Sequence, residues 1–336
     1  MTGFPYAYGG PPLRGRMRAT AEDFVVDEEL GFDADGSGEH AWLHIEKRDA
    51  NTEWVARQLA LAAGVAPMAV GFSGLKDRHA LTRQTFSVHL PGRADPDWHA
   101  LEIEGVRILA ASRHSRKLKR GVHRGNHFRI RLCELHGDRE VAQLRIGQIA
   151  RSGVPNYFGE QRYGRDGENL RSAHALFAGA RMGRSQRGFA LSAARAHLFN
   201  LLLARRVEQG TWDQALEGEV WMLAGTHSIF GPQALDEDVR QRLLNHDIDP
   251  TGPLWGAGAL RSAGEVASIE RAVAQAENSL AEGLAAHDLR QERRSLRLHA
   301  SAFNHEWMDD GSLVLGFSLP SGSFATALLR EICATA

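Results

Sequence analysis

The sequence has little of what marks a disulfide-bonded or cofactor-dependent protein. Its 336 residues contain two cysteines, Cys133 and Cys333, which lie far apart and outside any CxxC pair. A bridge would need the fold to bring them together, so we expect two free, buried thiols. The sequence also contains no Walker A loop, no GxGxxG between a strand and a helix, no HExxH and no GxSxG. Because these motifs bind phosphates, dinucleotides and zinc or present a nucleophilic serine, we expect a protein without a nucleotide cofactor.

A metal site is not expected either. Among the 16 histidines, His40 and His44 stand four residues apart, as do His123 and His127. Both pairs lie in regions that we expect to be non-helical, so the spacing gives them no shared face. No cysteine or carboxylate stands at ligand spacing beside them.

Long apolar runs are missing as well. No stretch approaches the roughly 18 apolar residues of a membrane span. The segment from Met1 to Tyr6 lacks the basic start and apolar stretch of a signal peptide. The composition, 43% hydrophobic and 24% charged, is that of a globular protein. A chain of this length is expected to form two domains, and we expect it in the cytoplasm.

Acidic residues are absent from one long stretch. The net charge is 40 − 41 = −1, which by itself indicates no polyanionic partner. From Gly105 to Cys133, however, there is no acidic residue, whereas Glu22 to Glu39 is rich in them. The acid-free stretch carries Arg107, Arg113, Arg116, Lys117, Lys119, Arg120, Arg124, Arg129 and Arg131. Such separated blocks are compatible with a basic face that attracts phosphates, although a solvated face flanking a strand is the alternative.

The first 150 residues alternate short strands with one helix. The clearest strand is 128–135, because its residues alternate strictly between apolar and polar. Asn51 or Thr52 can cap a helix that Gly64 can end. Further strands are expected at 24–26, 41–46 and 85–92.

The texture of the sequence changes near residues 153 and 298. Asp138 can cap a helix to about Ser152, and from 156 to about 297 most signals are helical, as at 192–210 and from Val266 to Leu280. Beyond residue 296 we expect a strand at 313–320 and a short helix at 324–332. An α-rich segment between two mixed segments suggests an inserted domain, with both chain ends building the first domain.

Asp77 stands out as a candidate for chemistry. It lies between Lys76 and Arg78 in a glycine-containing loop that enters a strand. Adjacent cations favour an ionised carboxylate, which can act as a nucleophile or a base. The alternative is a solvated turn with a surface ion pair.

Five segments, spread in order over 300 residues, resemble motifs of the tRNA pseudouridine synthase D family. They are AEDFVVDE at 21–28, GLKDRHALTRQTFS at 74–87, KRGVHRGNHF at 119–128, VPNYFGEQRYG at 154–164 and LPSGSFAT at 319–326. The resemblance implies an α+β fold, in which a pseudouridine synthase catalytic domain on an antiparallel sheet with flanking helices is formed by 1–153 and 299–336. An α-rich TRUD-type domain, 154–298, is inserted into it.

The same resemblance implies an activity. Family members isomerise uridine to pseudouridine in tRNA, usually at position 13 in bacteria, and consume no cofactor. The glycosidic C–N bond breaks, the flipped-out base turns and a C–C bond forms. Asp77 matches the family's catalytic aspartate, which could act first as nucleophile and then as base. Attack on the uracil ring and attack on the ribose are both compatible with the sequence.

Other positions match the family one at a time. Phe24 matches an aromatic residue that contacts the substrate in the family, and Phe324 matches the aromatic of its C-terminal motif. Both are therefore expected to bind the substrate, with core packing as the alternative for each. Asn126 could hydrogen-bond the extruded uracil and Phe128 could stack on it, whereas a turn after Gly125 is the plain reading of Asn126. Arg18 stands where the family often has lysine.

Charged neighbours complete the expected site. Lys76 and Arg78 are expected to tune or orient Asp77, and Arg78 could equally contact a phosphate. The expected contacts to the tRNA backbone are Arg116, Lys117, Lys119 and Arg124.

Two alternatives come from other functional classes. A non-catalytic tRNA-binding or chaperone protein would use the basic stretch but give Asp77 no role. A cofactor-free hydrolase using Asp77 with Lys76 would make the basic stretch accidental. The Lys-Asp-Arg signature speaks against the first alternative, and the five motifs speak against the second.

Overall fold

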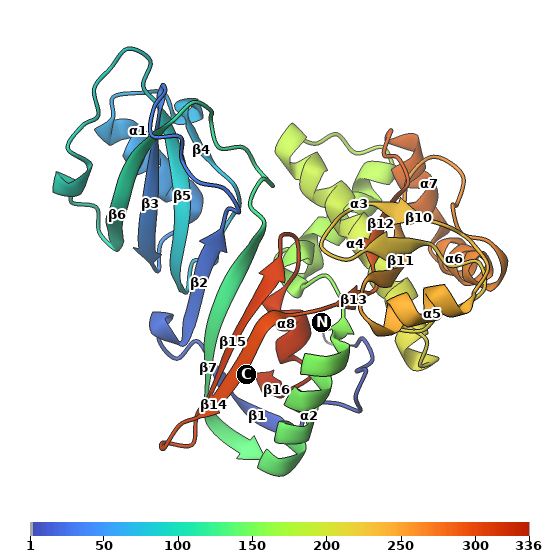
Figure 1. Ribbon diagram of the computed structural model, residues 1–336. Coiled ribbons are helices and arrows are strands. Elements are labelled where there is room, and N and C mark those ends of the chain that lie inside the picture. The colour runs from blue at the N-terminus through green and yellow to red at the C-terminus, as the bar shows by residue number, and fades with distance from the viewer. Residues whose placement is uncertain (1–2, 336) are drawn as a thin grey trace. The chain divides into compact units, whose positions relative to one another are not determined.

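The computed structural model describes residues 3–335, so Met1, Thr2 and Ala336, at the outer ends of the expected first domain, lie outside the described residues. The chain divides into two compact units, each of which combines segments distant in sequence (Figure 1). We call residues 13–138, 300–322 and 334–335 the sheet unit, and residues 3–12, 139–299 and 323–333 the helical unit.

The sheet unit is built on one ten-stranded, mostly antiparallel sheet. Its main order is β14-β15-β7-β2-β5-β3-β6, with β1 on β7, β16 on β1 and β4 on β5. Only the β2–β5 pair is parallel among the registers of the described strands. The strands are β1 Leu13–Met17, β2 Phe24–Glu29, β3 His40–Arg48, β4 Val70–Phe72, β5 Leu81–His89, β6 Val106–His114, β7 Gly125–Gly137, β14 Ser301–Trp307, β15 Leu313–Pro320 and β16 Cys333–Thr335. The expected antiparallel sheet, with a strand supplied by 313–320, is confirmed.

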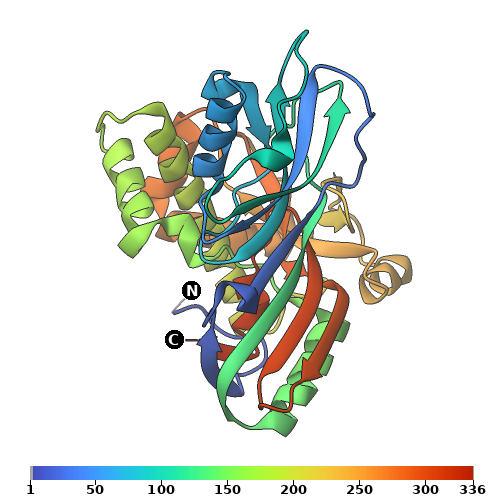
Figure 2. The same cartoon turned by 90° about the vertical axis from the view of Figure 1, so that its left-hand side faces the viewer.

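Helix α1 (Thr52–Ala62) covers part of this sheet, as Figure 2 shows. Its N-cap is Asn51, whose side chain accepts hydrogen bonds from the backbone of the first turn. Val55 and Leu59 pack on Leu43 and Phe86 of the sheet, and this apolar burial holds the helix in place. Short 3-10 turns lie at η1 Ala21–Asp23, η2 Pro67–Ala69 and η3 Trp98–Ala100.

The long strand β7 organises the part of the sheet that matters for function. Phe128, Ile130 and Leu132 alternate inward along it, as the sequence predicts. It pairs with β15 over that strand's whole length and with β2. In the latter register Glu28 lies directly opposite Asn126, where two side chains on neighbouring strands can interact.

The helical unit is centred on the long helix α4. Phe199, Leu202 and Leu203 of α4 pack with Phe158 and Trp212 in one buried cluster. Arg145 of α2 donates hydrogen bonds to the carbonyls of Gly10 (2.7 Å) and Glu331 (3.0 Å), which ties the two terminal segments into this unit. The helices are α2 Arg139–Ser152, α3 Glu168–Phe177, α4 Arg184–Glu208, α5 Glu237–Leu244, α6 Gly264–Ala276, α7 Asn278–Ala286 and α8 Ala325–Leu329, with 3-10 turns at η4 Glu160–Tyr163 and η5 Arg165–Gly167.

A small antiparallel sheet in this unit departs from the helical texture of the sequence. It has the order β10-β9-β11-β12, with β9 Trp221–Leu223, β10 Ile229–Phe230, β11 Ile248–Leu254 and β12 Glu292–Ser295. The sequence did not reveal it because β11 carries Pro250, Gly252 and Pro253, which are unfavourable in strands, and the other strands are too short to show a period. Similarly, the single helix marked by Val266 to Leu280 is two helices that meet at Glu277.

The chain enters and leaves the middle segment at one place. β8 (Val154–Pro155) pairs antiparallel with β13 (Arg297–Leu298), so Val154 and Leu298 are register partners. These are the positions near which the texture of the sequence changes. Among residues 3–335, no helix is both long and apolar enough to cross a membrane.

Candidate functional site

Asp77 lies in the connection between β4 and β5, at the edge of the sheet unit. Its Oδ2 is 3.4 Å from Nη2 of Arg18, and both side chains are about a third exposed, 30% and 31%. Arg18 has a left-handed backbone conformation (φ 64°) just before η1. Its guanidinium also lies 4.0 Å from the centroid of the Phe24 ring, a cation–π contact that fixes its direction. The result is a solvent-accessible carboxylate paired with an oriented cation.

The backbone around Asp77 is held by hydrogen bonds to polar side chains of β3, α1 and β5. Nζ of Lys47 donates to the carbonyls of Asp77 (2.9 Å) and Ala50 (2.8 Å). Oγ1 of Thr52 accepts a hydrogen bond from the backbone N–H of Lys76 (3.1 Å), and Gln84 donates to the Gly74 carbonyl (3.2 Å). A loop held in this way can present its carboxylate in a constant position.

Lys47 is fully buried, and that burial has an electrostatic consequence. Removal from water lowers the pKa of Lys47 to about 8, while the negative charge of Asp77 acts in the opposite direction. Lys47 is therefore a cation in the interior, directly behind the candidate catalytic loop.

Lys76 is directed elsewhere than toward Asp77. Its Nζ lies 3.0 Å from Oε2 of Glu28 and donates to Oδ1 of Asn126 at 2.6 Å. Glu28 also accepts hydrogen bonds from the hydroxyl of Ser73 and from the backbone N–H of Thr85 (3.1 Å). The Lys76 and Glu28 side chains are 4% and 1% exposed, so this ion pair is almost completely removed from water. Arg78, in contrast, is exposed and its Nε donates to the carbonyl of Asp49 (3.4 Å).

Of the expected aromatic residues, Phe24 and Phe128 are buried and Phe324 is half-buried. Phe24 and Phe128 meet edge to face on neighbouring strands, with ring centroids 6.2 Å apart, and Phe128 also stacks on Phe317. They form an apolar layer next to Arg18. Phe324 belongs to the helical unit, where it contacts Phe158 edge to face at 5.9 Å.

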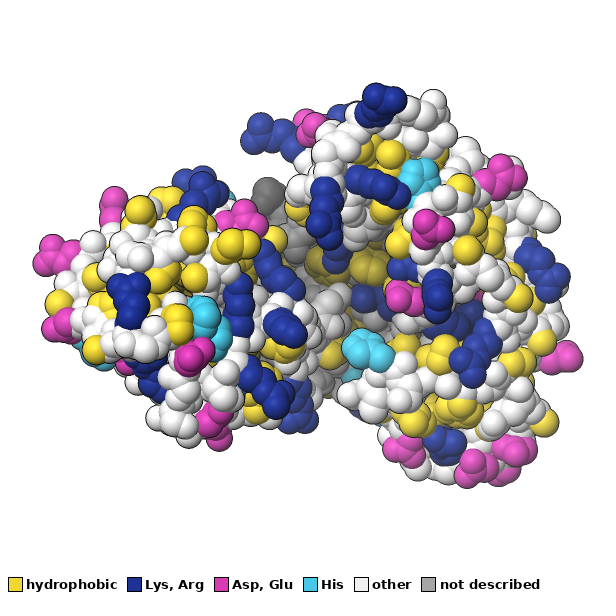
Figure 3. All heavy atoms as spheres, turned by 90° about the horizontal axis from the view of Figure 1, so that it is seen from above, with side chains coloured by type: hydrophobic (Ala, Val, Ile, Leu, Met, Phe, Trp, Pro, Cys, Tyr) yellow, Lys and Arg dark blue, Asp and Glu magenta, His cyan; other side chains and the backbone are white. Residues whose placement is uncertain are grey.

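The expected phosphate contacts lie on the connection between β6 and β7, residues 115–124, which we call the basic connection. Its side chains Arg116, Lys117, Lys119 and Arg124 are exposed. Leu118 is buried and anchors the connection, because its backbone N–H donates to Ser87 Oγ at 2.9 Å. Figure 3 shows Lys and Arg side chains gathered on the surface of the sheet unit.

Part of the acid-free stretch is already neutralised. Arg107 pairs with Glu46 (2.8 Å), and Arg113 pairs with Asp95 (3.0 Å). Arg131 pairs with Asp310. Among the described residues no ion pair involves the side chains of Arg116, Lys117, Lys119 or Arg124, so no carboxylate neutralises these four charges, although Nζ of Lys117 donates to the carbonyl of Met68.

Two charged residues of the site were not identified from the sequence, Lys47 and Glu28. Both could have been found from the alternation of inward-facing and outward-facing residues along their strands. Lys47 continues the inward phase of Leu43 and Ile45, and Glu28 continues that of Phe24 and Val26. A charge at an inward position of a strand needs a buried partner, and such positions are therefore candidates for function.

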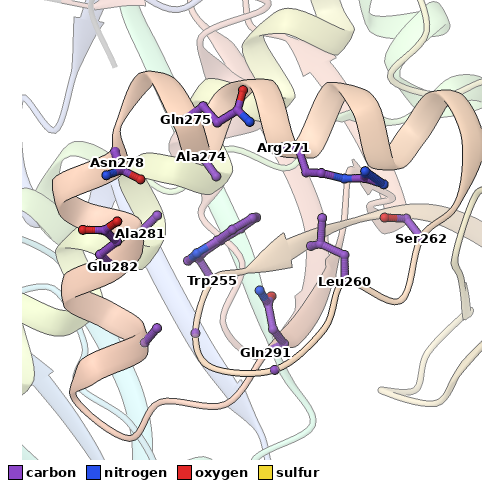
Figure 4. A pocket seen from close by; sticks show the side chains of 13 residues that line it. Trp255, Leu260, Ser262, Arg271, Ala274, Gln275, Asn278, Ala281, Glu282 and Gln291 are labelled. Carbon is purple, nitrogen blue, oxygen red and sulfur yellow. The ribbon is translucent and has the colours of Figure 1, made fainter.

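A pocket of about 550 Å³ lies in the helical unit, and none of the residues that line it belongs to the five motifs. Trp255, Leu260 and Gln291 line one side, and α6 and α7 line the other (Figure 4). No cluster of three or more histidine, cysteine or acidic side chains suited to a metal occurs in residues 3–335. The candidate site is therefore the carboxylate site around Asp77.

Comparison with known proteins gives a consistent result. A model of the family described as tRNA pseudouridine synthase D (TruD) matches residues 3–179 and 169–332. The tRNA pseudouridine synthase D of Xanthomonas campestris pv. campestris (strain 8004) is 48% identical over 343 residues, covering 98% of this chain and 94% of that protein. The protein of the same name from Methylococcus capsulatus is 47% identical over 330 residues, covering 98% and 93%.

A solved structure is similar in fold. The crystal structure of a Methanosarcina mazei protein assigned as tRNA pseudouridine synthase D has a TM-score of 0.75, at 21% sequence identity. The match covers 97% of this chain and 95% of that one. At this identity the likeness concerns the fold alone, and it agrees with the α+β architecture expected from the sequence.

Proposed function

The chain belongs to the tRNA pseudouridine synthase D family, and from this premise we propose that Asp77 is its catalytic carboxylate. The protein is an isomerase that converts uridine to pseudouridine in tRNA. One observation supports this assignment most directly. The carboxylate of Asp77 is accessible to solvent, lies on a loop held by hydrogen bonds, and is 3.4 Å from the guanidinium of Arg18.

The reaction requires one carboxylate and a uracil that is flipped out of the stacked bases of the tRNA. The C1′–N1 bond breaks, the uracil turns, and C1′ bonds to C5. The proton leaves C5 and N1 is protonated, so no net atom or electron is exchanged. Asp77 serves first as nucleophile, at the ring or at the ribose, and is regenerated as a carboxylate when the intermediate collapses. Arg18 keeps this carboxylate in place beside the base.

The flipped uridine needs contacts that replace its lost stacking and pairing. Phe24 and Phe128 supply an apolar floor next to Arg18. Asn126 supplies a hydrogen bond to the base from the beginning of β7, where its amide oxygen accepts a hydrogen bond from Nζ of Lys76. Phe324, which matches the aromatic of the C-terminal motif, is a further candidate for contact with the substrate, and Arg78 is an exposed cation next to Asp77 in the chain.

The basic connection binds the phosphate backbone of the tRNA. Its four accessible cations, without carboxylate partners among the described residues, support this role. The target is uridine at position 13, as the family resemblance implies, and the enzyme works in the cytoplasm. The catalytic domain comprises residues 1–153 and 299–336, with 154–298 as the inserted TRUD domain.

Asp77→Asn tests the central assignment. It keeps the shape of the side chain and removes the charge, and an amide is a poor nucleophile and base. Pseudouridine formation should fall by several orders of magnitude, roughly 10³-fold or more, while tRNA affinity stays within a few-fold because phosphate contacts are untouched. Single-turnover assays with enzyme in excess, together with filter binding, measure both quantities. Near-normal turnover would refute the assignment of Asp77 as the catalytic carboxylate.

A further inference from the structure

The buried ion pair of Lys76 and Glu28 has no evident role in holding Asp77. Lys76 follows directly before Asp77 in the sequence, yet its ammonium contacts Glu28 and Asn126, on β2 and β7. Removing two charges from water costs free energy that their attraction hardly recovers, so such a pair contributes little net stability. Stability alone therefore does not explain why this ion pair is present in the site.

The chemistry of lysine fixes the orientation of the Asn126 amide. An ammonium group has three donors and no acceptor. The atom of Asn126 that faces Nζ at 2.6 Å must therefore be the carbonyl Oδ1 and cannot be Nδ2. A flip of the amide would place its N–H groups against a cation. In the part of the chain that the structure describes, no hydrogen bond uses Nδ2 of Asn126, whose side chain is half-buried.

We propose that Lys76 is a positioning residue that locks Asn126 as a hydrogen-bond donor to O4 of the flipped uracil, with Glu28 holding the Lys76 ammonium in place. The proposal rests on the proposed function, because it assumes that Asn126 faces the base. Uracil and cytosine share O2 and differ at the 4-position, where uracil has an acceptor oxygen and cytosine a donor amino group. A fixed hydrogen-bond donor facing the 4-position therefore favours binding of uracil and disfavours binding of cytosine.

A different role for Lys76, tuning the charge of Asp77, makes a separable prediction. A change in the reactivity of Asp77 alters the rate on every substrate by the same factor. Loss of the Asn126 lock alters the ratio of rates between substrates that differ at the 4-position alone. The informative quantity is therefore the ratio of single-turnover rates on tRNA carrying uridine or 4-thiouridine at the target, because sulfur is a weaker acceptor than oxygen.

The experiment compares matched variants. Lys76→Met alone would leave the buried charge of Glu28 without its cation, so it is combined with Glu28→Gln, and thermal unfolding verifies folding. The control is Arg206→Met with Glu219→Gln, which removes a similarly buried ion pair (2.9 Å) in the helical unit. Asn126→Ala reports the complete loss of the base contact, and Lys76→Arg tests whether another cation restores the lock.

The wild type and the Arg206/Glu219 control should prefer uridine over 4-thiouridine by roughly tenfold, the loss expected for one weakened hydrogen bond. In Asn126→Ala and in the Lys76/Glu28 double variant the ratio should approach one, and Lys76→Arg should recover part of it. A wild-type ratio in the double variant would overturn the proposal. Failure of the proposed function would be seen separately, as an active Asp77→Asn variant, whatever these ratios are.

Discussion

The backbone carbonyl of Asp77 accepts a hydrogen bond from Nζ of Lys47 at 2.9 Å, although Lys47 belongs to the interior of the sheet. A carbonyl held by a charged donor is bound more firmly than one held by a neutral donor. The position of the candidate catalytic loop therefore depends on Lys47, which is fully buried and so is not expected to touch the substrate.

Lys47→Met should reduce the single-turnover rate by roughly 10- to 100-fold, since small displacements of a catalytic group are costly. The free energy of unfolding should change little or increase, because an apolar side chain then replaces a buried charge. The two measurements are rate with enzyme in excess and urea unfolding. A rate within twofold of wild type would show that the other loop contacts suffice.

The stability of the wild type should rise with pH on account of Lys47. Its pKa is lowered from 10.5 to about 8 in the folded chain. Between these values the unfolded chain binds more protons, so the free energy of unfolding increases with pH across that window. Below about pH 8 the cost of the buried charge is fully present. Relative to Lys47→Met, the wild type should gain at most about 3 kcal/mol between about pH 8 and pH 10.5. Parallel pH profiles of urea unfolding for the two proteins would contradict this.

Neutralising Arg116, Lys117 and Lys119 together should weaken tRNA binding and lower its dependence on salt. Each lost phosphate contact reduces the slope of log affinity against log salt by about one unit. The matched control is the pair Arg107 and Arg113, which already have carboxylate partners and whose neutralisation should leave the slope almost unchanged. Filter binding over a salt series decides between the basic connection and a merely solvated face, for which the slope would not move.

Truncation before Ser301 should destroy the sheet unit and not merely shorten the chain. It removes β14 and β15, and β15 covers β7 over eight consecutive register pairs from Leu313 to Pro320. The exposed edge of β7 would lose both its hydrogen bonds and its apolar cover. A truncated chain that still unfolds cooperatively and is fully active would show this view of the sheet to be wrong.

Local signals in the sequence predicted the elements whose determinants are local. The alternation at 128–135 predicted β7, and the cap at Asn51 predicted α1. In contrast, β11 was hidden by its own prolines, because its pairing with β9 and β12 overrides a poor intrinsic preference.

The site shows the same division. Asp77 could be singled out from its neighbours and motif, but the direction of Lys76 could not. That direction is set by Glu28, which is distant in sequence and is brought near Lys76 by the pairing of β2 with β5. Lys47 was not identified for a similar reason, since its link to the site is a hydrogen bond to the carbonyl of Asp77, 30 positions away.

The pairing of Val154 with Leu298 has an evolutionary consequence. Where a long excursion of the chain begins and ends on adjacent strands, material can be gained, lost or exchanged within it while the two flanking ends stay neighbours. We therefore expect differences in length among members of the family to accumulate between these two positions, and the order of β2, β5 and β7 to stay unchanged. The middle segment could then change in length and sequence among relatives while the pairing of its two ends and the sheet stay the same.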